Sequence, residues 1–471
     1  MPEPPILRAY QGEAVAEVRA AFSARRRRVL FVLPTGGGKT VVFTYVASSA
    51  AARGRRVAIV VHRRELVKQA TRALAAVGVA HGVIAAGEPE TADPVQVASV
   101  DTLARRLDRV GAFDLVVVDE AHHAVAGTWE RVLAAFPGAF VLGVTATPER
   151  LDGRGLAAAF DVMIEGPSVA DLTAAGWLVP ATVYAPPARV DLSAVGRRAG
   201  DYAVEELAEA MSDAVLVGNA VDHYRRLGGG APAVAFCVNV AHSRLVAARF
   251  TAAGFRAAHV DGDTPEAERD RLIGALATGE LQVLANCGLI AEGVDVPAIG
   301  AAILLRPTRS LGLYLQMVGR ALRPAPGKAR ALVFDHASNT WTHGLPAAPR
   351  SWGLEDRPPR GRQRAKAPGE AHRDCPDCGA VHAPATPTCA ACGAELKPGP
   401  AEIAEIEAEL VEVQRQEQGR LADQVAGMSY ARALRWAASD ESRLRLVAQV
   451  RGYRRGWVAH RLLEIDREQR C

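Results

Sequence analysis

The chain has 471 residues, of which 49% are apolar and 23% are charged, and its formal net charge is +4. This length is too great for one hydrophobic core and predicts roughly three domains, and the ordinary composition excludes a wholly disordered chain. The small positive charge is compatible with a nucleic-acid partner but does not identify one.

The cysteines and the N-terminal residues indicate the compartment. Four of the seven cysteines lie between Cys375 and Cys392 in two C-x-x-C pairs, a pattern that favours a reducing compartment with one metal site over a disulfide framework. Residues 1–5 lack the basic and apolar segments of a signal peptide, and no apolar run reaches the roughly 20 residues that a spanning helix needs. We therefore expect a soluble, cytoplasmic protein without a membrane partner.

Short apolar, β-branched runs alternate with helical patterns in two stretches of the chain. Such alternation predicts parallel β-α-β units, with ligands bound at the carboxyl ends of the strands. The pattern weakens at residues 191–200, so we expect two α/β lobes with a boundary between 180 and 215. The predicted strands are residues 29–33, 57–61, 95–99, 115–119, 140–145, 233–238, 257–260, 281–285, 300–305 and 331–334.

A phosphate-binding loop follows the first predicted strand, in the sequence VLFVLPTGGGKT at residues 29–40. Glycines let backbone N–H groups turn toward an anion, and the following helix adds its positive end. Lys39 can reach the β- and γ-phosphates, and Thr40 can ligate Mg²⁺. The strict pattern has glycine where this chain has Leu33. The predicted nucleotide-binding residues of the loop are Thr35, Gly36, Gly37, Gly38, Lys39 and Thr40.

An acidic pair ends the predicted strand at 115–119, where residues 119–122 read DEAH. A carboxylate at the tip of a parallel strand faces the ligand crevice. We expect Asp119 to hold Mg²⁺ and Glu120 to act as the general base that polarises the attacking water.

With these motifs the chain resembles the superfamily 2 helicases of the DEAD/DEAH-box type, over about residues 6–346. Within them it is most similar to the bacterial and phage branch related to type III restriction subunits and the RadD-type DNA repair helicases. The resemblance implies two tandem RecA-like lobes, ATP and Mg²⁺ as ligands, and a nucleic-acid partner, with DNA preferred to RNA.

The resemblance assigns roles to further motifs. Residues 7–11, LRAYQ, match the motif in which Gln11 reads adenine, and residues 145–147, TAT, match the motif that couples hydrolysis to lobe movement. In the second lobe, residues 288–297 match a motif that would put Gly293 and Asp295 near the ribose.

Residues 316–323, QMVGRALR, resemble the arginine-finger motif, and helical spacing puts Gln316, Arg320 and Arg323 on one face. We expect these three residues to act in catalysis. Because Lys39 and Glu120 come from the first lobe, only a closed cleft would complete the site, so hydrolysis would depend on lobe closure.

Two further motifs of the first lobe, VHRREL at 61–66 and ASVDT at 98–102, resemble the strand-gripping motifs of the family. Their side chains suit phosphate contacts that carry no base information, although each could instead be an ordinary surface polar group. The predicted nucleic-acid contacts are Arg63, Arg64, Ser99 and Thr102.

The two C-x-x-C-G sequences at residues 375–379 and 389–393 are typical of zinc knuckles. Four thiolates complete a tetrahedral structural Zn²⁺ site. In the alternative interpretation, the cysteines form a redox pair or disulfides and hold no metal. The predicted zinc ligands are Cys375, Cys378, Cys389 and Cys392.

The predicted organisation has five parts. They are an ATP-binding lobe at 1–182, a C-terminal helicase lobe at 183–350, a basic linker at 351–370, a zinc ribbon at 371–398 and a helical region at 399–471. The helical region contains Arg451, Tyr453 and Trp457, which suit either base stacking or packing within the protein. The zinc ribbon and the helical region are candidate contacts for a protein partner.

We therefore predict an ATP-dependent DNA helicase or translocase in repair or DNA processing. An RNA helicase shares the same ATPase residues, and the motor subunit of a restriction system would need a partner for cleavage, since no nuclease motif is evident. A non-enzymatic scaffold is disfavoured because Lys39, Asp119, Glu120 and Arg323 are all present.

Overall fold

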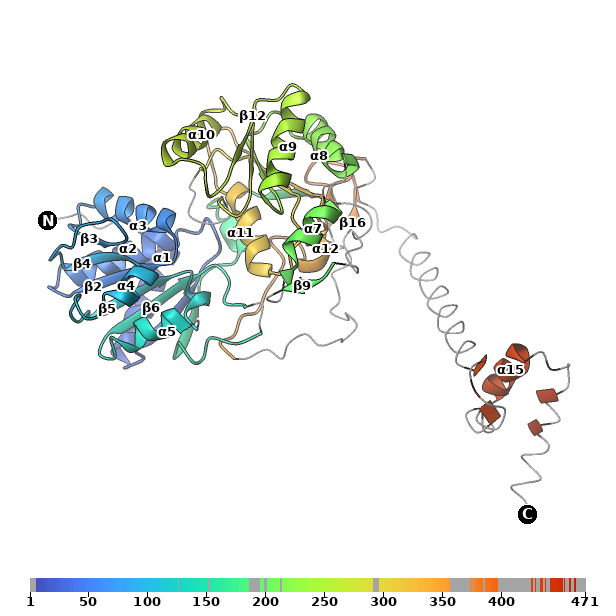
Figure 1. Ribbon diagram of the computed structural model, residues 1–471, viewed down its shortest axis with the longest axis horizontal. Helices are drawn as coiled ribbons and strands as arrows, with labels where there is room; N and C mark the ends of the chain where they lie inside the picture. The colour runs from blue at the N-terminus through green and yellow to red at the C-terminus, as the bar shows by residue number, and fades with distance from the viewer. Residues whose placement is uncertain are drawn as a thin grey trace, which may run out of the picture. The chain divides into compact units, whose positions relative to one another are not determined.

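The computed structural model divides the chain into two units, Met1–Ala394 and Glu395–Cys471 (Figure 1). The first unit contains both α/β lobes, drawn blue to teal and green to orange. The structure describes residues 6–125, 127–150, 153–185, 195–198, 201–211, 214–290, 296–355, 373–375, 377–383, 386–396 and short pieces between 425 and 462.

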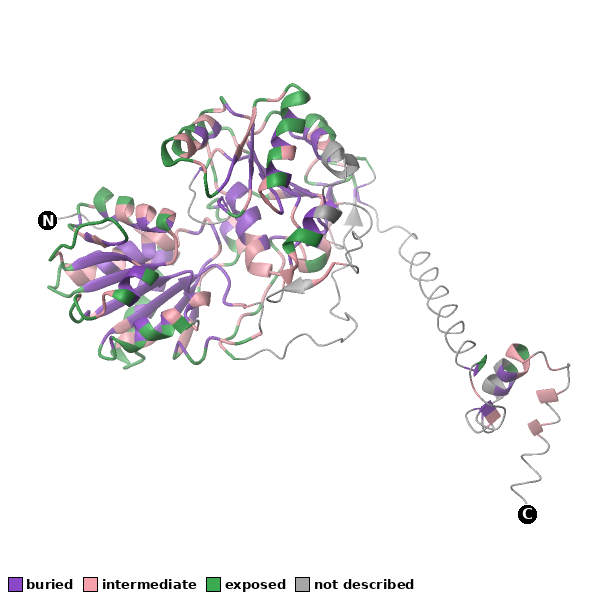
Figure 2. Ribbon diagram, in the orientation of Figure 1, coloured by how far each residue is buried: buried purple, intermediate pink, exposed green. Residues whose placement is uncertain are grey.

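The first lobe is a seven-stranded sheet in the order β3-β4-β2-β5-β6-β1-β7, and all its strand pairs are parallel. Its central strands are buried along their whole length because helices cover both faces (Figure 2). The strands are β1 (Arg28–Val32), β2 (Val57–Val61), β3 (Gly82–Ile84), β4 (Val95–Ser99), β5 (Leu115–Asp119), β6 (Phe140–Thr145) and β7 (Val162–Glu165).

Alternate residues of each strand enter different cores. Phe31 packs in a cluster with residues of α1, α2 and α3, whereas its neighbour Leu30 packs with residues of α4 and α5 on the other face. The helices of this lobe are α1 (Ala9–Ser23), α2 (Lys39–Ala51), α3 (Arg64–Ala76), α4 (Val100–Arg105), the 3₁₀ turn η1 (Ala121–His123), α5 (Gly127–Ala134) and α6 (Val169–Ala174).

The second lobe has an eight-stranded sheet in the order β12-β13-β11-β14-β15-β8-β17-β16. Its first six strands are parallel, and β17 adds to β8 in the antiparallel sense. The strands are β8 (Ala181–Tyr184), β11 (Ala233–Phe236), β12 (Ala257–Val260), β13 (Val283–Asn286), β14 (Ala301–Leu304), β15 (Ala331–Asp335), β16 (Arg373–Asp374) and β17 (Val381–His382).

A small hairpin and six helices complete this lobe in the part of the chain that the structure describes. The hairpin consists of β9 (Arg197–Arg198) and β10 (Asp201–Tyr202). The helices are α7 (Val204–Met211), α8 (Ala214–Leu227), α9 (Val240–Ala252), α10 (Glu266–Thr278), α11 (Leu311–Ala321) and α12 (Asn339–His343).

The two parallel-sheet lobes confirm the predicted fold class. All ten predicted strands are present, each with ends within two residues of the prediction. The sequence prediction missed β3, β7 and β8, and also the two-residue strands β9, β10, β16 and β17. Strand β3 has only three residues, and β7 and β8 lie outside the regular alternation, in the segment that leads from one lobe to the other.

The zinc-ribbon segment contacts the second lobe directly. Val381 of β17 pairs with Val183 of β8. Arg330 also donates from Nη1 to the carbonyls of Ala390 and Ala391 at 3.2 and 3.0 Å. The ribbon therefore continues the second sheet. Strand β8 itself spans the position at which we placed the lobe boundary.

The second unit has its own small core. Helix α15 (Glu441–Val450) contributes the buried side chains of Leu444 and Val447, and the rings of Tyr453 and Trp457, 4.7 Å apart, pack against this cluster. Among the described helices, none has both the length and the apolar character needed to cross a membrane.

Candidate nucleotide site and metal centre

The loop between β1 and α2 requires its glycines. Gly36 and Gly38 have φ angles of 87° and 90°, which L side chains rarely adopt. A Cβ on Gly37 would lie 2.8 Å from the Leu33 side chain, so this position has no room for one either. Helix α2 begins at Lys39, directly after the loop, and its N-terminus is the arrangement that binds phosphate.

Gln11 lies against this loop, as its predicted role requires. Its side chain is buried, and its Nε2 donates to the carbonyl of Gly37 at 3.3 Å. Its Oε1 accepts from the backbone N–H of Arg8 at 3.0 Å. Both ends of the amide are thus held by the protein, and reading adenine would require an exchange of these partners. The adenine-binding role stays a prediction.

The two carboxylates lie where the β5 strand ends. Asp119 and Glu120 are buried, and Glu120 has a φ of 49°, in the left-handed region. Burial, and then the negative charge of Glu120, raises the pKa of Asp119 to about 7, while the Lys39 ammonium acts in the opposite direction. Two neighbouring buried carboxylates disfavour their own ionised forms, and a divalent cation relieves this repulsion. Asp119 together with the Thr40 hydroxyl therefore suits Mg²⁺.

Helix α11 of the second lobe packs directly on the phosphate loop. A Cβ placed on Gly319 would lie 2.5 Å from the Cβ of Thr35, and one placed on Gly36 would lie 3.4 Å from the Cγ of Arg323. Burial lowers the pKa of Lys39. The carboxylates of Glu120 and Asp119 act against this shift, and the smaller effects of the Arg320 and Arg323 charges add to it. The structure therefore brings both arginines within electrostatic reach of Lys39, the predicted phosphate-binding residue.

The other members of the predicted site are near this contact or outside the described residues. Gln316 is buried on α11, and a Cβ on Gly312 at the start of that helix would lie 2.7 Å from the Oγ1 of Thr147. The TAT motif thus faces the arginine-bearing helix. Gly293 and Asp295 lie outside the described residues.

The predicted nucleic-acid contacts differ in exposure. Arg64 is exposed at the start of α3, and Arg63 is half-buried, with its Nη1 donating to the carbonyl of Gly288 in the second lobe at 2.7 Å. Ser99 is half-buried at the end of β4, whereas Thr102 is buried within α4. Arg64 is therefore the most accessible of the four.

Several neighbours of the site were not identified from the sequence. Two ion pairs join α3 of the first lobe to α10 of the second, Glu65 with Arg269 and Lys68 with Glu266. The partners are about 200 residues apart in the chain, so no local pattern could reveal them. His62, beside Arg63 in the strand-gripping motif, is a further neighbour, and only its position in that motif could have pointed to it.

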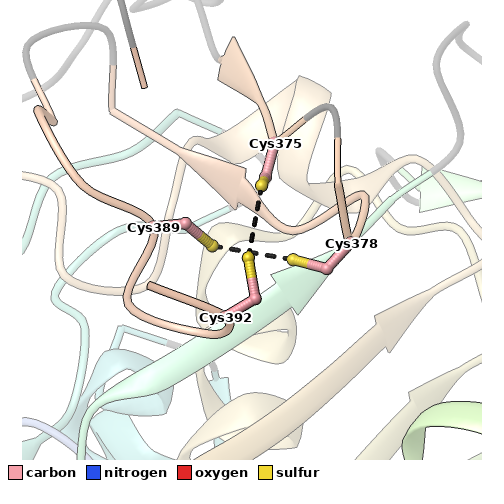
Figure 3. Close-up of side chains that lie close together, drawn as sticks. All are labelled: Cys375, Cys378, Cys389 and Cys392. Carbon is pink, nitrogen blue, oxygen red and sulfur yellow. Dashed lines mark hydrogen bonds between the residues drawn. The ribbon is translucent and has the colours of Figure 1, made fainter. Parts of the chain in front are cut away.

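The four cysteines of the ribbon converge on one point (Figure 3). Their sulfur atoms all lie within 4.8 Å of one another, and the pairs Cys375–Cys392 and Cys378–Cys389 are each 3.6 Å apart. A tetrahedron with Zn–S bonds of about 2.3 Å has edges of roughly 3.8 Å, so these separations fit a zinc ion.

The knuckles have the backbone that such a site needs. The glycine after each C-x-x-C, Gly379 or Gly393, has a φ of 71° or 79°. The N–H of Cys375 donates to the carbonyl of Ala380, and the N–H of Cys389 donates to that of Ala394, at 2.8 and 2.7 Å. Each short turn therefore presents two sulfurs on the same side.

Comparison with known families and proteins agrees with this geometry. The family profile described as "Type III restriction enzyme, res subunit" matches residues 5–150, and the "Helicase conserved C-terminal domain" matches residues 220–325. A 51.5 kDa protein of a Lactococcus phage is 33% identical over 76% of this chain and 76% of its own length.

Two further similarities are informative. The putative ATP-dependent helicase IRC3 of Saccharomyces cerevisiae is 31% identical over 74% of the chain, which spans only 54% of that relative. A fragment of a putative HsdR subunit of a type I restriction enzyme from Vibrio vulnificus has the same fold, with a TM-score of 0.58, 22% identity, and coverage of 73% of this chain and 67% of the other. The two family profiles match both lobes, and the phage relative is one third identical over most of its length. The predicted nucleotide site lies between two RecA-like sheets. The chain therefore belongs to the superfamily 2 helicases, the ATP-hydrolysing enzymes that include the motor subunits of restriction systems.

Proposed function

We propose that the protein is a DNA-dependent helicase or translocase that acts in the cytoplasm, in DNA repair or processing. The observation that carries this proposal is the contact of α11 with the phosphate loop, which puts Arg320 and Arg323 within electrostatic reach of Lys39. A site that needs both lobes makes hydrolysis depend on closure, and a nucleic acid bound across the lobes favours the closed state.

The residues have separate tasks in the proposed reaction. Lys39 and the N-terminus of α2 hold the phosphates, and Glu120 orients the attacking water and accepts its proton. Arg320 and Arg323 stabilise the charge that develops on the transferred phosphoryl group, with Gln316 beside them on α11. Mg²⁺ held by Asp119 and Thr40 would supply neutralisation of the phosphate oxygens.

The preference for DNA draws on the named relatives. A DNA 3'-5' translocase, XPB2 of Sulfurisphaera tokodaii, is 34% identical over 31% of the chain, and a subunit of the EcoKI type I restriction endonuclease is 24% identical over 70% of it. An RNA helicase, DeaD of Mycobacterium tuberculosis, matches over only 16%. Phosphate release measured with single-stranded DNA, duplex DNA and RNA tests the proposal, and stimulation by RNA alone would overturn the assignment to DNA.

A motor subunit of a restriction or defence system is the second candidate. It is favoured by the match of residues 5–150 to the type III restriction subunit profile. Stimulation by duplex DNA, with cleavage only after a nuclease partner is added, would support this candidate over a repair enzyme.

Glu120→Gln should retain ATP binding and lose hydrolysis, since an amide cannot accept the proton of the attacking water. We expect turnover to fall by roughly 10²- to 10⁴-fold. Phosphate release and binding of a fluorescent nucleotide measure the two effects. Glu130→Gln, at an exposed position on α5, is the matched control. Near-normal hydrolysis in the Glu120 variant would refute its role as the base.

Arg323→Ala should slow hydrolysis by on the order of 10³-fold while ATP affinity changes far less, because the arginine acts mainly in the transition state. Arg320→Ala and the double variant show how the two residues share this task. Arg249→Ala, exposed in the last turn of α9 in the same lobe, should have no effect. Intact hydrolysis in the double variant would show that the second lobe does not complete the site.

Binding to single-stranded DNA should weaken steeply with salt, and Arg64→Ala should reduce the slope of log K against log salt by roughly one. Arg64 is a cleaner probe than Arg63, which also bonds to the second lobe. Anisotropy titrations from low to high salt give the slope. Arg53→Ala, exposed beyond the end of α2, should leave it unchanged. Affinity that does not depend on salt would contradict a phosphate track.

We also propose that Cys375, Cys378, Cys389 and Cys392 hold one structural Zn²⁺. Cys378→Ser should release the metal and unfold the ribbon, because a module of this size depends on its ion. Since β17 covers the edge of β8, we expect a lower melting temperature with ATP binding and basal hydrolysis retained. Elemental analysis and calorimetry measure these changes.

Cys287→Ser, at a described cysteine that is not one of the four clustered thiols, is the matched control, and this variant should keep its zinc. Purified protein that contains no zinc when zinc is supplied would rule out the site. Loss of basal hydrolysis in a folded Cys378 variant would mean that the ribbon is part of the motor.

A further inference from the structure

Three histidine rings of the first lobe contact one another in a row, and successive rings are tilted by 58° and 42°. We call His62, His123 and His122 the histidine row. His62 follows β2, and His122 and His123 lie in η1 after β5. The strands β2 and β5 are parallel neighbours, so their carboxyl ends bring the three rings together. The centroids of His62 and His123 are 4.8 Å apart, and those of His123 and His122 are 4.1 Å apart.

The histidine row connects Arg63, the predicted strand contact, with Glu120, the predicted general base. At one end, Nε of Arg63 donates to Nε2 of His62 at 3.3 Å. At the other end, Nδ1 of His122 lies 3.4 Å from Oε2 of Glu120. The predicted strand contact and the predicted general base are therefore joined through side chains in direct contact.

The end of the histidine row at Glu120 is also connected to the second lobe. Nδ1 of His122 lies 3.2 Å from Oγ1 of Thr145, which donates to the carbonyl of Thr147 at 2.9 Å. Thr147 faces Gly312 at the start of α11, the helix that carries Arg320. A shift of the His122 ring would be felt both at Glu120 and at this helix.

Arg63 can transmit the arrival of a strand because its present partners are replaceable. A guanidinium only donates, so His62 accepts through Nε2, and Gly288 accepts from Nη1. A phosphate oxygen is a stronger, charged acceptor that would take over these donors. His62 would then lose one of the interactions that hold its ring, and in a closely packed row a shift of one ring is passed to the rings in contact with it.

We propose that His62 and His123 are positioning residues that couple strand binding at Arg63 to the placement of Glu120. The inference rests on the proposed nucleic-acid-dependent ATPase. Neither histidine touches ATP or the strand in this scheme. They act on the rate only through the side chain of Glu120, the one residue of the path that meets the attacking water.

The test compares basal and DNA-stimulated ATP hydrolysis of the full chain. His62→Ala and His123→Ala should each reduce the stimulation by roughly 2- to 30-fold, the range of coupling through packed networks. Basal turnover, DNA affinity and melting temperature should stay at wild-type values. His81→Ala is the matched control, because this half-buried histidine of the same lobe lies outside the histidine row and bonds to the Val79 carbonyl.

Phenylalanine variants separate the two kinds of contact. His123→Phe keeps a ring in the histidine row and should retain the stimulation of hydrolysis by DNA. His62→Phe also keeps a ring but offers no acceptor to Arg63, so it should lose the stimulation. The double variant of His62→Ala with His123→Ala should lose no more than the single variants, since both residues lie on one path.

Four results would overturn the inference. They are full stimulation in the alanine variants, full stimulation in His62→Phe, double-variant losses that multiply, and basal turnover that falls in proportion to the stimulated rate. The last would indicate a purely structural role. If the wild type is stimulated by neither DNA nor RNA, the proposed function itself fails, and the inference fails with it. The wild-type panel thus distinguishes the two failures.

Discussion

The close packing of α11 on the phosphate loop is the contact on which the rest of the site depends. Gly319 lies so near Thr35 that a Cβ would have no space, and this absence of a side chain lets the helix backbone reach the loop. This packing also brings Arg320, the next residue along, and Arg323 near Lys39, the proposed phosphate-binding residue. If α11 stood away from the loop, the same sequence would hold ATP without the charges that stabilise its cleavage.

The polar contacts that join the lobes elsewhere are weak by comparison. Glu65 pairs with Arg269 and Lys68 with Glu266 between α3 and α10, at partly exposed positions. Exposed pairs of this kind contribute about 0–1 kcal/mol each and are screened by salt. These two pairs therefore add little free energy to the contact between the lobes, whose buried apolar side chains belong to one continuous cluster.

The sequence predicted what local patterns determine. Buried strands such as β2 are continuous apolar runs, and the glycines before Lys39 mark a loop whose backbone only glycine adopts readily. The spacing of the cysteines predicted the convergence of four sulfurs. The rest depends on tertiary pairing. No pattern in Ala181–Tyr184 shows that β8 lies beside β15, and nothing in the motif around His62 shows that its ring meets His123.

The zinc ribbon lies at the edge of the second sheet, beside β8. Strand β8 is the first strand of its lobe in the chain. In the parallel part of the sheet its one neighbour is β15, which leaves its other edge available for pairing. An uncovered edge would present unpaired N–H and C=O groups to other chains. Strand β17 pairs with this edge at Val183, and Arg330 donates hydrogen bonds to the second knuckle. If the proposed Zn²⁺ holds the ribbon together, the pairing at this edge depends on the four thiolates as well. The ribbon is thus part of the architecture of the second lobe, whatever else it binds.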